Sequence, residues 1–314
     1  EADRSVLKEG QPGNVLEIYE DKPINYDAWD IDIFYTQKKE TAKLAEAVEL
    51  VEKGELKAVV RFVFKYHKST IRQDMTVYKD SRRIDFVTQA DWQETQRLLK
   101  TAFYTNIRST KAVYDIQFGH AERPTHWNTS WDWARYEVCG HKWADLSENG
   151  YGVSLLNDCK YGYSIKDNAV KLSLLKSAVY PDTTADKGVH EFIYSLYPHI
   201  GNVTEGGTIE AANQLNLPAQ VISGVFTDRR KLVEVSSDCV QIDEVKKAEE
   251  EDCLIVRLHE CRGGRRKVTL TSQFDVKRIV PCNLLEHDTG EAVEGSKVSF
   301  EVTPFMIKTF KLYL

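Results

Sequence analysis

The sequence predicts an all-β protein made of two sandwich domains in series. Many short segments rich in β-branched and aromatic residues follow one another closely, turn residues separate them, and a clear helical signal is rare. A length of 314 residues allows about two domains, each with its own hydrophobic core. We expect a linker or the cut edge of a domain at residues 1–13, a first domain at 14–222 and a smaller β-sandwich at 223–314.

The first strands follow the polar N-terminal stretch. Residues 14–20 alternate between apolar and polar side chains, which predicts a strand. Residues 24–35 show the same alternation, because aspartates stand between isoleucines, and we expect a second strand there. Residues 46–51 and 56–66 are expected to pair as a hairpin, although the composition of residues 37–47 favours a helix.

The rest of the first domain is expected to consist of strands in quick succession. They are predicted at 69–78, 83–88, 95–104, 111–118, 134–138, 152–157, 161–166, 169–176 and 189–199. Asp167-Asn168 is typical of a hairpin turn. One helix is predicted at 208–215, because Gly206-Gly207 precedes it and Pro218 follows it.

From about residue 223 the strands become shorter and more polar. They are predicted at 232–236, 240–246, 253–260, 267–272, 276–282, 297–302 and 306–314. Acidic and basic turns separate them, and this number of strands in so short a stretch is typical of a small immunoglobulin-like sandwich.

Charge and composition exclude several classes of partner. The formal charge is −6, and the 42 basic residues are interleaved with 48 acidic ones, so neither nucleic acid nor an anionic membrane surface is expected as a partner. No apolar run approaches the roughly 20 residues that a membrane helix needs. Six scattered cysteines without a C-x-x-C pair indicate buried thiols in a reducing, cytoplasmic compartment, and their spacing leaves open the alternative of three disulfides in a secreted enzyme. The chain begins Glu-Ala-Asp and both methionines are internal, so we expect a fragment of a longer protein.

One stretch, residues 123–163, stands out by its composition. It holds four of the six tryptophans, together with amides, carboxylates and cations. Sugars bind to such combinations, because their apolar faces stack on rings while their hydroxyls need polar partners. A tryptophan-rich β core with a polar rim has the same composition, and we expect these tryptophans to lie mainly in the core.

Motifs for other chemistries are weak. The sequence contains neither G-x-S-x-G nor a glycine-rich phosphate loop that opens a helix. His126, Cys139 and His141 offer zinc-ligand chemistry, but their spacing matches no known zinc pattern and structural packing is the better interpretation. Carboxylates are plentiful, and a glycosidase needs two of them across a sugar, but the sequence does not show which two converge.

Four long segments resemble a known family. Residues 20–35, 123–148, 151–177 and 182–199 resemble the C-terminal half of glycoside hydrolase family 38 α-mannosidases, in the branch of the cytosolic and vacuolar-type enzymes and their bacterial relatives. The likeness runs from about residue 14 to the C-terminus and is weaker beyond residue 218.

The resemblance implies a galactose-mutarotase-like supersandwich followed by a small immunoglobulin-like β-sandwich. It implies membership of a retaining α-mannosidase whose aspartate nucleophile and zinc ligands belong to an N-terminal catalytic domain that this chain does not contain. The chain alone is then expected to be inactive, without a catalytic residue or metal of its own. Its expected partners are that catalytic domain and α-mannosides or oligosaccharides, and a homo-oligomer is left open.

The resemblance also implies which residues lie near substrate. An aromatic corner that contacts sugar in the family corresponds to Asp27 and Trp29 here. The other positions that the resemblance places near substrate are Asp158, Lys160, Lys176, Asp182 and His190. The secretory branch carries Asp-Arg-x-x-Gly where this chain reads Asp158-Cys-Lys-Tyr-Gly162, and it carries a basic residue where Lys176 stands. A lysine does not replace the bidentate fork of an arginine at either place.

Two other functions stay open on the sequence. The chain could be a stand-alone carbohydrate-binding or assembly module without chemistry. It could also be a mutarotase-like sugar enzyme, because that fold hosts several reactions. The second alternative requires a histidine, with His126, His141 and His190 as candidates, to converge with a carboxylate in an open cleft of the first domain.

Overall fold

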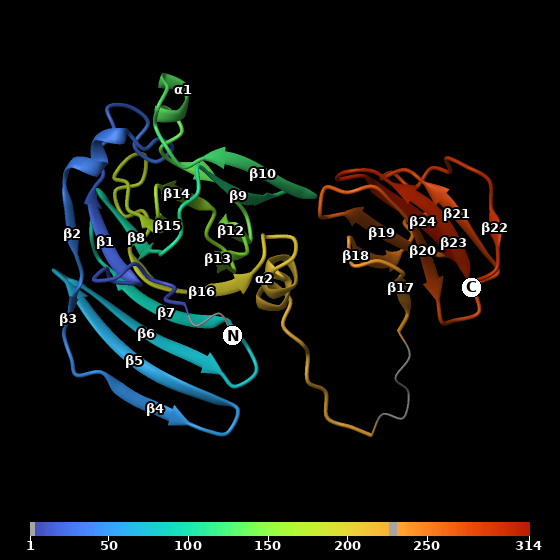
Figure 1. Cartoon of the computed structure of the whole chain (residues 1–314), viewed down its shortest axis with the longest axis horizontal. Helices are drawn as coiled ribbons and strands as arrows, with labels where there is room; N and C mark the ends of the chain where they lie inside the picture. The colour runs from blue at the N-terminus through green and yellow to red at the C-terminus, as the bar shows by residue number, and fades with distance from the viewer. Residues whose placement is uncertain (1–3, 226–230) are drawn as a thin grey trace. The chain divides into compact units, whose positions relative to one another are not determined.

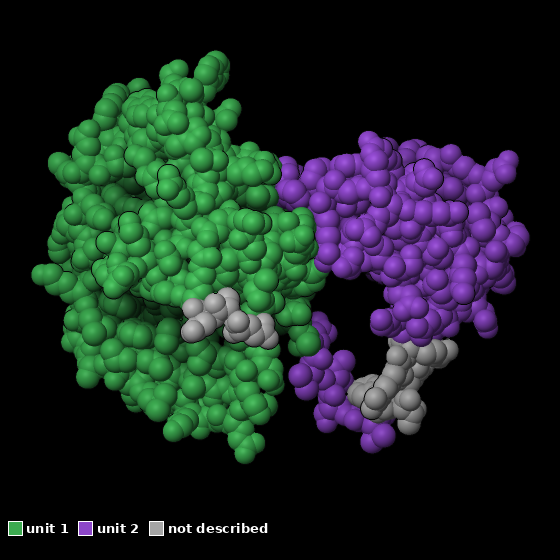
Figure 2. All heavy atoms as spheres, in the orientation of Figure 1, with its two compact units in different colours: residues 1–115, 121–219 green, residues 116–120, 220–314 purple. Residues whose placement is uncertain are grey.

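The computed structural model describes residues 4–225 and 231–314, and these form two compact units (Figures 1 and 2). The first unit comprises Glu1–Asp115 and Ala121–Ala219, and the second comprises Ile116–His120 and Gln220–Leu314. Both are built from antiparallel sheets, so the predicted all-β class is confirmed.

Two sheets of unequal size make up the first unit. The six-stranded sheet has the order β11 (Val138–Cys139), β14 (Gly162–Lys166), β15 (Ala169–Lys176), β8 (Arg97–Tyr104), β1 (Val15–Glu20) and β2 (Lys39–Thr41). The ten-stranded sheet has the order β10 (Gly119–Pro124), β9 (Lys111–Ile116), β12 (Trp143–Glu148), β13 (Tyr151–Asn157), β16 (Gly188–Ile200), β7 (Ile84–Trp92), β6 (Ser69–Tyr78), β5 (Lys57–Tyr66) and β3 (Lys43–Leu44), and β4 (Glu49–Lys53) also pairs with β5.

The main core takes its side chains from both sheets. Ile18 of β1 and Leu172 of β15 belong to the same buried cluster as Leu155 of β13 and Phe86 of β7. Alternate residues of each strand point to this core, which is the period-two pattern that the sequence shows. Trp92 is also fully buried there, and its indole nitrogen donates to Ser177 Oγ at 2.9 Å, so the ring is both packed and paired.

The N-terminal residues join the first unit. Leu7 forms a β-bridge with Thr105, and the side chains of Val6 and Leu7 pack against the main core. The backbone nitrogen of Lys8 donates to the carbonyl of Tyr104 at 3.0 Å. From residue 4 onward the stretch that we expected to be a linker or domain edge is therefore tied to β8 and the loop that follows it.

The predicted strand over residues 24–35 is wrong. The chain instead turns, with Tyr26 at a φ of 55°, and then forms the 3₁₀ helix η1 (Ile33–Gln37). The carboxylate of Asp32 accepts the backbone N–H of Ile24 at 2.7 Å, and the carbonyl of Tyr26 accepts that of Trp29 at 2.8 Å. Such local bonds between aspartate side chains and the backbone compete with strand pairing.

The predicted strand over residues 134–138 is reduced to β11, because a short helix precedes it. In α1 (Ser130–Trp133) the Thr129 hydroxyl accepts from the Asp132 backbone while the Asp132 carboxylate accepts from the Thr129 backbone. The expected core role of the tryptophans fails for Trp131 and Trp133, which are 77% and 48% exposed, whereas Trp143 is buried.

One helix was predicted correctly. α2 (Thr208–Asn216) follows Gly206-Gly207, and Gly207 caps it with a φ of 84°. Ala211 and Ala212 of this helix pack against the buried ring of Trp143. Strands β2, β10, β12 and the short β22 of the second unit were not predicted as separate strands.

The second unit is a small sandwich of two sheets. The three-stranded sheet has the order β17 (Val233–Val235), β20 (Arg266–Ser272) and β23 (Lys297–Val302). The five-stranded sheet has the order β18 (Val240–Lys247), β19 (Leu254–Glu260), β24 (Ile307–Tyr313), β21 (Arg278–Cys282) and β22 (Val293–Glu294). Their inner faces meet in a core that includes Val256, Leu270 and Phe310.

Glu260, at the end of β19, organises a loop of the second unit. It is fully buried, and its carboxylate accepts the backbone N–H groups of Arg262, Gly263, Gly264 and Phe305 at 2.9–3.0 Å. Gly263 adopts a φ of 76°, which a residue with a side chain rarely tolerates. The glycines of the basic turn therefore let the backbone wrap around a buried charge.

Candidate functional site

A cleft opens along the six-stranded sheet. Its volume is about 520 Å³. The lining residues come from the loop before η1, from β8, from β11 and the residue before it, from β14 and the residue before it, and from the end of β15. They are Trp29, Ile31, Leu98, Glu137, Val138, Cys139, Tyr161, Gly162, Ser173, Leu174, Leu175 and Lys176. The structure thus brings together two of the predicted site residues, Trp29 and Lys176.

Trp29 stands at the cleft with 70% of its surface exposed. The turn that carries it is held by Asp27, whose Oδ2 accepts the backbone N–H of Val179 at 2.6 Å and that of Tyr180 at 3.2 Å. Val179 follows shortly after β15, so Asp27 attaches the tryptophan corner to the strand that supplies Lys176. Asp27 is therefore placed to position Trp29.

Lys176 points to a carboxylate within the protein. Its ammonium pairs with Asp21, which is 1% exposed. Burial raises the pKa of Asp21, and the nearby Lys176 opposes this shift only in part. Lys176 is thus an ion-pair partner of Asp21 at the edge of the cleft, and a sugar contact would have to share its ammonium with that carboxylate.

Glu137 lies at the cleft and was not predicted. Its Oε1 accepts hydrogen bonds from the Tyr35 hydroxyl and from the ammonium of Lys100, a fully buried lysine. Burial lowers the pKa of Lys100, and Glu137 opposes that shift. The other oxygen of Glu137, Oε2, is buried and has no hydrogen-bond partner among the described residues, and the same holds for the hydroxyl of Ser173 on β15.

A second charged cluster lies on β1 and β15 of the same sheet. Glu17, 1% exposed, pairs with Lys171 at 2.8 Å and with Lys39 at 2.7 Å. Burial by itself would raise the pKa of Glu17, but hydrogen bonds from Lys171, Lys39 and Tyr19 lower it to about 2. Paired buried charges of this kind fix one arrangement of side chains, because breaking a pair leaves an uncompensated charge.

Asp158 and Lys160 lie on the loop between β13 and β14, beside the cleft but not in its lining. The backbone nitrogen of Asp158 donates to the carbonyl of Ile193 at 3.1 Å. The Lys160 ammonium stands 4.7 Å from the centre of the Phe192 ring. The same loop continues into Tyr161, which does line the cleft and is 51% exposed.

Asp182 and His190 do not join Trp29 in the cleft lining. The Asp182 carboxylate accepts from the backbone nitrogen and the hydroxyl of Thr184, both at 2.8 Å, and the backbone N–H lowers its pKa. His190 Nε2 makes a 2.8 Å hydrogen bond with the carbonyl of Asp186. Both side chains therefore organise the loop before β16 and the start of that strand.

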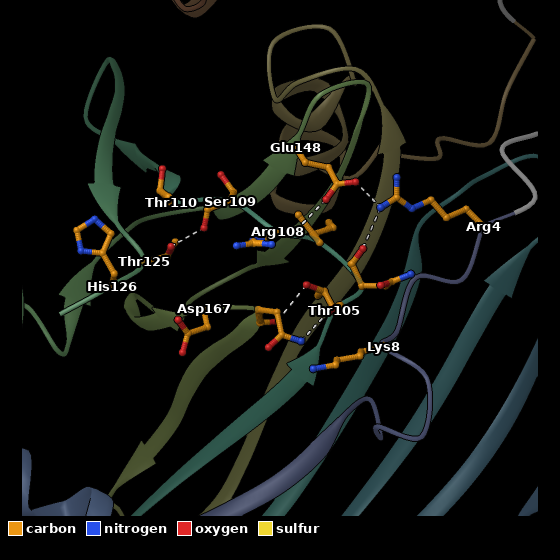
Figure 3. Close-up of a pocket in the computed structure, with 13 residues that line it drawn as sticks. Arg4, Lys8, Thr105, Arg108, Ser109, Thr110, Thr125, His126, Glu148 and Asp167 are labelled. Carbon is orange, nitrogen blue, oxygen red and sulfur yellow. Dashed lines mark hydrogen bonds and ion pairs between the residues drawn. The ribbon is translucent and has the colours of Figure 1, made fainter. Parts of the chain in front are cut away.

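A second, larger cavity of about 840 Å³ is strongly polar (Figure 3). Hydrogen bonds tie its walls together, such as that from the Asp167 backbone nitrogen to the Thr125 carbonyl at 2.8 Å and that from the Thr125 hydroxyl to the Ser109 carbonyl at 2.6 Å. Figure 3 shows the charged ends of Arg108 and Lys8 directed toward the open space. Among the described residues, the only aromatic ring in its lining is the imidazole of His126.

The histidines considered for a mutarotase-like enzyme have different surroundings. His126 lines the polar cavity, which Glu148 and Asp167 also line, and its Nδ1 is 3.6 Å from Asp132 Oδ2. The ring of His141 packs against Tyr161 with the ring centres 5.1 Å apart, and His190 bonds to the backbone. Within residues 4–225 and 231–314, no group of three or more His, Cys, Asp and Glu side chains is placed to hold a metal ion.

Two family models match the chain. Residues 1–184 match the model described as "Glycosyl hydrolases family 38 C-terminal domain", and residues 240–310 match "Glycosyl hydrolases family 38 C-terminal beta sandwich domain". Among solved structures, the chain resembles an α-mannosidase from Enterococcus faecalis V583 with a TM-score of 0.76 at 15% identity, over 95% of this chain and 38% of that one. At this identity the likeness shows the fold.

Three curated relatives illustrate the sequence similarity. Alpha-mannosidase G of Dictyostelium discoideum is 39% identical over 99% of this chain, alpha-mannosidase 2C1 of Homo sapiens is 36% identical over 99%, and the alpha-mannosidase of Saccharomyces cerevisiae is 32% identical over 96%. The chain spans only 30–31% of the length of each of these relatives. With both family models and this extent of identity, the chain belongs to glycosyl hydrolase family 38 and corresponds to the C-terminal region of its members.

Proposed function

We propose that this chain is the non-catalytic C-terminal β region of a retaining α-mannosidase and that its cleft forms one wall of the mannoside pocket. The observation that carries the proposal is the exposed ring of Trp29 beside Lys176 and Glu137. A ring that is 70% exposed and held by a paired aspartate offers a stacking surface for the apolar face of a sugar. The relatives named as α-mannosidases support mannosides as the substrate class.

The polar groups of the cleft suit hydroxyl recognition. Glu137 Oε2 and Ser173 Oγ are buried and have no hydrogen-bond partner in the described part of the chain, and buried polar atoms in folded proteins usually have one. A sugar hydroxyl, or a water that bridges to it, would supply the missing hydrogen-bond partner of each atom. Glu137 is fixed by Lys100 and Tyr35, so its free oxygen is held in one place before a ligand arrives.

The remaining predicted residues have supporting roles in this proposal. Asp27 positions the turn that carries Trp29, and the ion pair of Lys176 with Asp21 positions the end of β15. Asp158 and Lys160 hold the loop that carries Tyr161 into the cleft. Asp182 and His190 shape the neighbouring loop, from which they would approach an oligosaccharide longer than one sugar.

Bond cleavage belongs to another part of the enzyme in this proposal. Glycoside hydrolysis with retention needs a nucleophile and an acid–base carboxylate close together across the sugar. We assign these groups, and the ligands of the zinc ion expected of the family, to an N-terminal catalytic domain. All six cysteines are free thiols; four are buried as expected, whereas Cys139 and Cys159 are exposed. Free thiols are typical of a reducing compartment, and we propose a cytoplasmic location. No helix in the described part of the chain is long and apolar enough to span a membrane.

The test uses the longer enzyme that carries this region. Trp29→Ala should lower kcat/KM for an aryl α-mannoside about tenfold, the scale expected when a buried aromatic contact is lost from the bound state. Trp131→Ala is the matched control, because Trp131 is also highly exposed but does not line the cleft. Equal effects of both substitutions, or none at Trp29, would contradict the proposed wall of the pocket.

A binding module without chemistry is the alternative. It predicts that residues 1–314 alone bind methyl α-mannoside, as measured by titration with NMR detection, and that Trp29→Ala removes this binding. Both predict that the isolated chain releases no mannose from an aryl mannoside, but only the proposed function predicts that Trp29→Ala lowers kcat/KM of the longer enzyme. Zinc-dependent mannose release by the purified chain would overturn both.

A further inference from the structure

The ten-stranded sheet extends past the edge of the six-stranded one. The smaller sheet ends at β2, whereas the larger one continues through β5 to β3 and β4 (Figure 1). Five large apolar side chains in the short stretch from β3 to the start of β5 are exposed: Leu44, Val48, Leu50, Val51 and Leu56. Exposed apolar side chains that share one face of a sheet mark a surface that another body covers, so strand register decides which of these residues count.

Strand register shows that part of this apolar surface continues the core. Leu50 of β4 lies opposite Val60 of β5, which lies opposite Met75 of β6, which lies opposite Phe86 of β7. Directly paired residues point to the same face of a sheet. Along this row the exposed fraction falls from 58% at Leu50 to 4% at Phe86, a residue of the main core.

A second row shows the same gradient. Leu44 of β3 lies opposite Phe64 of β5, and Phe64 lies opposite Ile71 of β6. Leu44 is 49% exposed and Ile71 is 1% exposed. The overhanging face, defined here by Leu44, Leu50, Val60, Phe64 and Met75, is thus the outer end of the core-forming face.

The opposite face of the same strands carries the charged residues, beside Val59, Val63 and Val87. Arg61 of β5 makes two hydrogen bonds of 2.7 Å to the carboxylate of Asp74 on β6, and Glu49 of β4 lies opposite Arg61. Lys43 and Lys65 also pair in register. The strands are therefore amphipathic, and an amphipathic sheet requires a second layer over its apolar side.

The free edge of the sheet is protected against a second copy of the chain. The pairing of β4 with β5 contains a register shift between Leu50 and Glu52, and bulges of this kind interrupt edge-to-edge pairing. Glu49, Glu52 and Lys53 add charges along β4, and charged edge strands resist self-association. A partner is therefore expected to contact the face and not to extend the sheet.

We infer that the overhanging face packs against the catalytic part of the mannosidase. This inference rests on the proposed function. The chain spans 30–31% of its curated relatives, so more than two thirds of each relative lies outside the matched region and is available to supply the missing layer. The partner surface is expected to be apolar at its centre, facing Leu44 and Leu50, with a polar rim that meets the charges of β4.

The experiment compares hydrogen exchange in the longer enzyme and in residues 1–314 alone. Backbone amides of β4 and β5 are expected to exchange about tenfold or more slowly in the longer enzyme, because a covering layer excludes water and suppresses local opening. Leu50→Lys should abolish that protection. Val87→Lys is the matched control, because Val87 is also an exposed apolar residue (44%) but lies on the opposite face of the same sheet, paired with Asp74.

Several outcomes would overturn the inference. Equal exchange of β4 in both proteins, or equal effects of the two substitutions, would show that the catalytic part does not cover the face. If residues 1–314 alone form a dimer by light scattering, and Leu50→Lys makes it monomeric, the occupant is a second copy. Protection already present in a monomer of residues 1–314 would mean that another part of this chain covers the face.

The inference and the proposed function fail separately. If Trp29→Ala lowers kcat/KM while β4 exchanges equally fast in the longer enzyme and in residues 1–314 alone, the pocket wall is supported and this interface is rejected. If β4 exchanges more slowly in the longer enzyme than in residues 1–314 alone while Trp29→Ala keeps full activity, the interface is supported and the pocket wall is rejected.

Discussion

The carboxylate of Asp27 accepts the backbone N–H of Val179 across 152 positions of sequence, at 2.6 Å. This hydrogen bond joins the turn that carries Trp29 to the residues that follow β15. It explains how an irregular loop holds an exposed ring beside Lys176. A loop alone would let the ring move, whereas a charged acceptor with two backbone donors fixes its base.

Removing the Asp27 carboxylate should loosen the turn that carries Trp29. Asp27→Ala leaves the N–H groups of Val179 and Tyr180 without their acceptor, and we expect a loss of about 1–3 kcal/mol in the free energy of unfolding, measured with urea on residues 1–314. Asp27→Asn keeps an acceptor oxygen and should lose less. In the longer enzyme, Asp27→Ala should raise KM more than it lowers kcat, because it disturbs binding of the sugar. Equal stability of the alanine and asparagine variants would contradict this role.

Glu17 should make stability depend on acid pH. Its folded-state pKa of about 2 lies below the ordinary value of 4.5, so the unfolded state binds a proton more readily. The stabilisation is present above about pH 4.5 and is lost as the pH falls from there toward about 2. Glu17→Gln should lower the melting temperature at pH 7 and flatten its decline across that window. An unchanged acid profile in this variant would rule out Glu17 as a source of the pH dependence.

The Lys100–Glu137 pair should behave as one unit. Lys100→Met leaves the Glu137 carboxylate without its buried cation, and we expect a loss of about 3 kcal/mol or more in unfolding free energy. The double variant Lys100→Met with Glu137→Gln should recover part of this loss, because no uncompensated charge remains. Strictly additive effects in the double-mutant cycle would mean that the two residues do not interact.

Glu260→Gln should destabilise the loop of residues 261–265 in the second unit. The amide keeps one acceptor oxygen where the carboxylate serves four backbone N–H groups, so we expect a loss of about 1.5–3 kcal/mol. Amides of Gly263 and Gly264 should then exchange faster with solvent. Asp243→Asn is a control in the same unit, because Asp243 pairs with His259 and does not contact this loop. Unchanged exchange at both glycines would show that Glu260 does not hold the loop.

Local sequence patterns predicted the regular part of the fold. Helix α2 was found from Gly206-Gly207 and Pro218, and hairpins such as β14–β15 were found from Asp167-Asn168, because these residues fix backbone conformation within a few positions. The same reasoning failed at residues 24–35. There the alternation of aspartate and isoleucine matches a strand, but the Asp32 carboxylate and the Tyr26 carbonyl bond to nearby backbone groups and form a turn.

The candidate site was only partly accessible from sequence. The resemblance directed attention to Trp29 and Lys176, which line one cleft, and also to Asp182 and His190, which do not. Glu137 was missed because nothing local distinguishes it. Its importance comes from Lys100, 37 positions away, and Tyr35, 102 positions away.

The sequence by itself determined the all-β class and the family, because turn residues, strand periodicity and long stretches of similarity are local properties of the chain. Tertiary structure alone decided which side chains meet. It joined Asp27 to Val179, placed Glu137 over the buried Lys100, and left Leu44 and Leu50 exposed at the outer end of the core-forming face. These relationships depend on strand order and register across two sheets, which no single segment encodes.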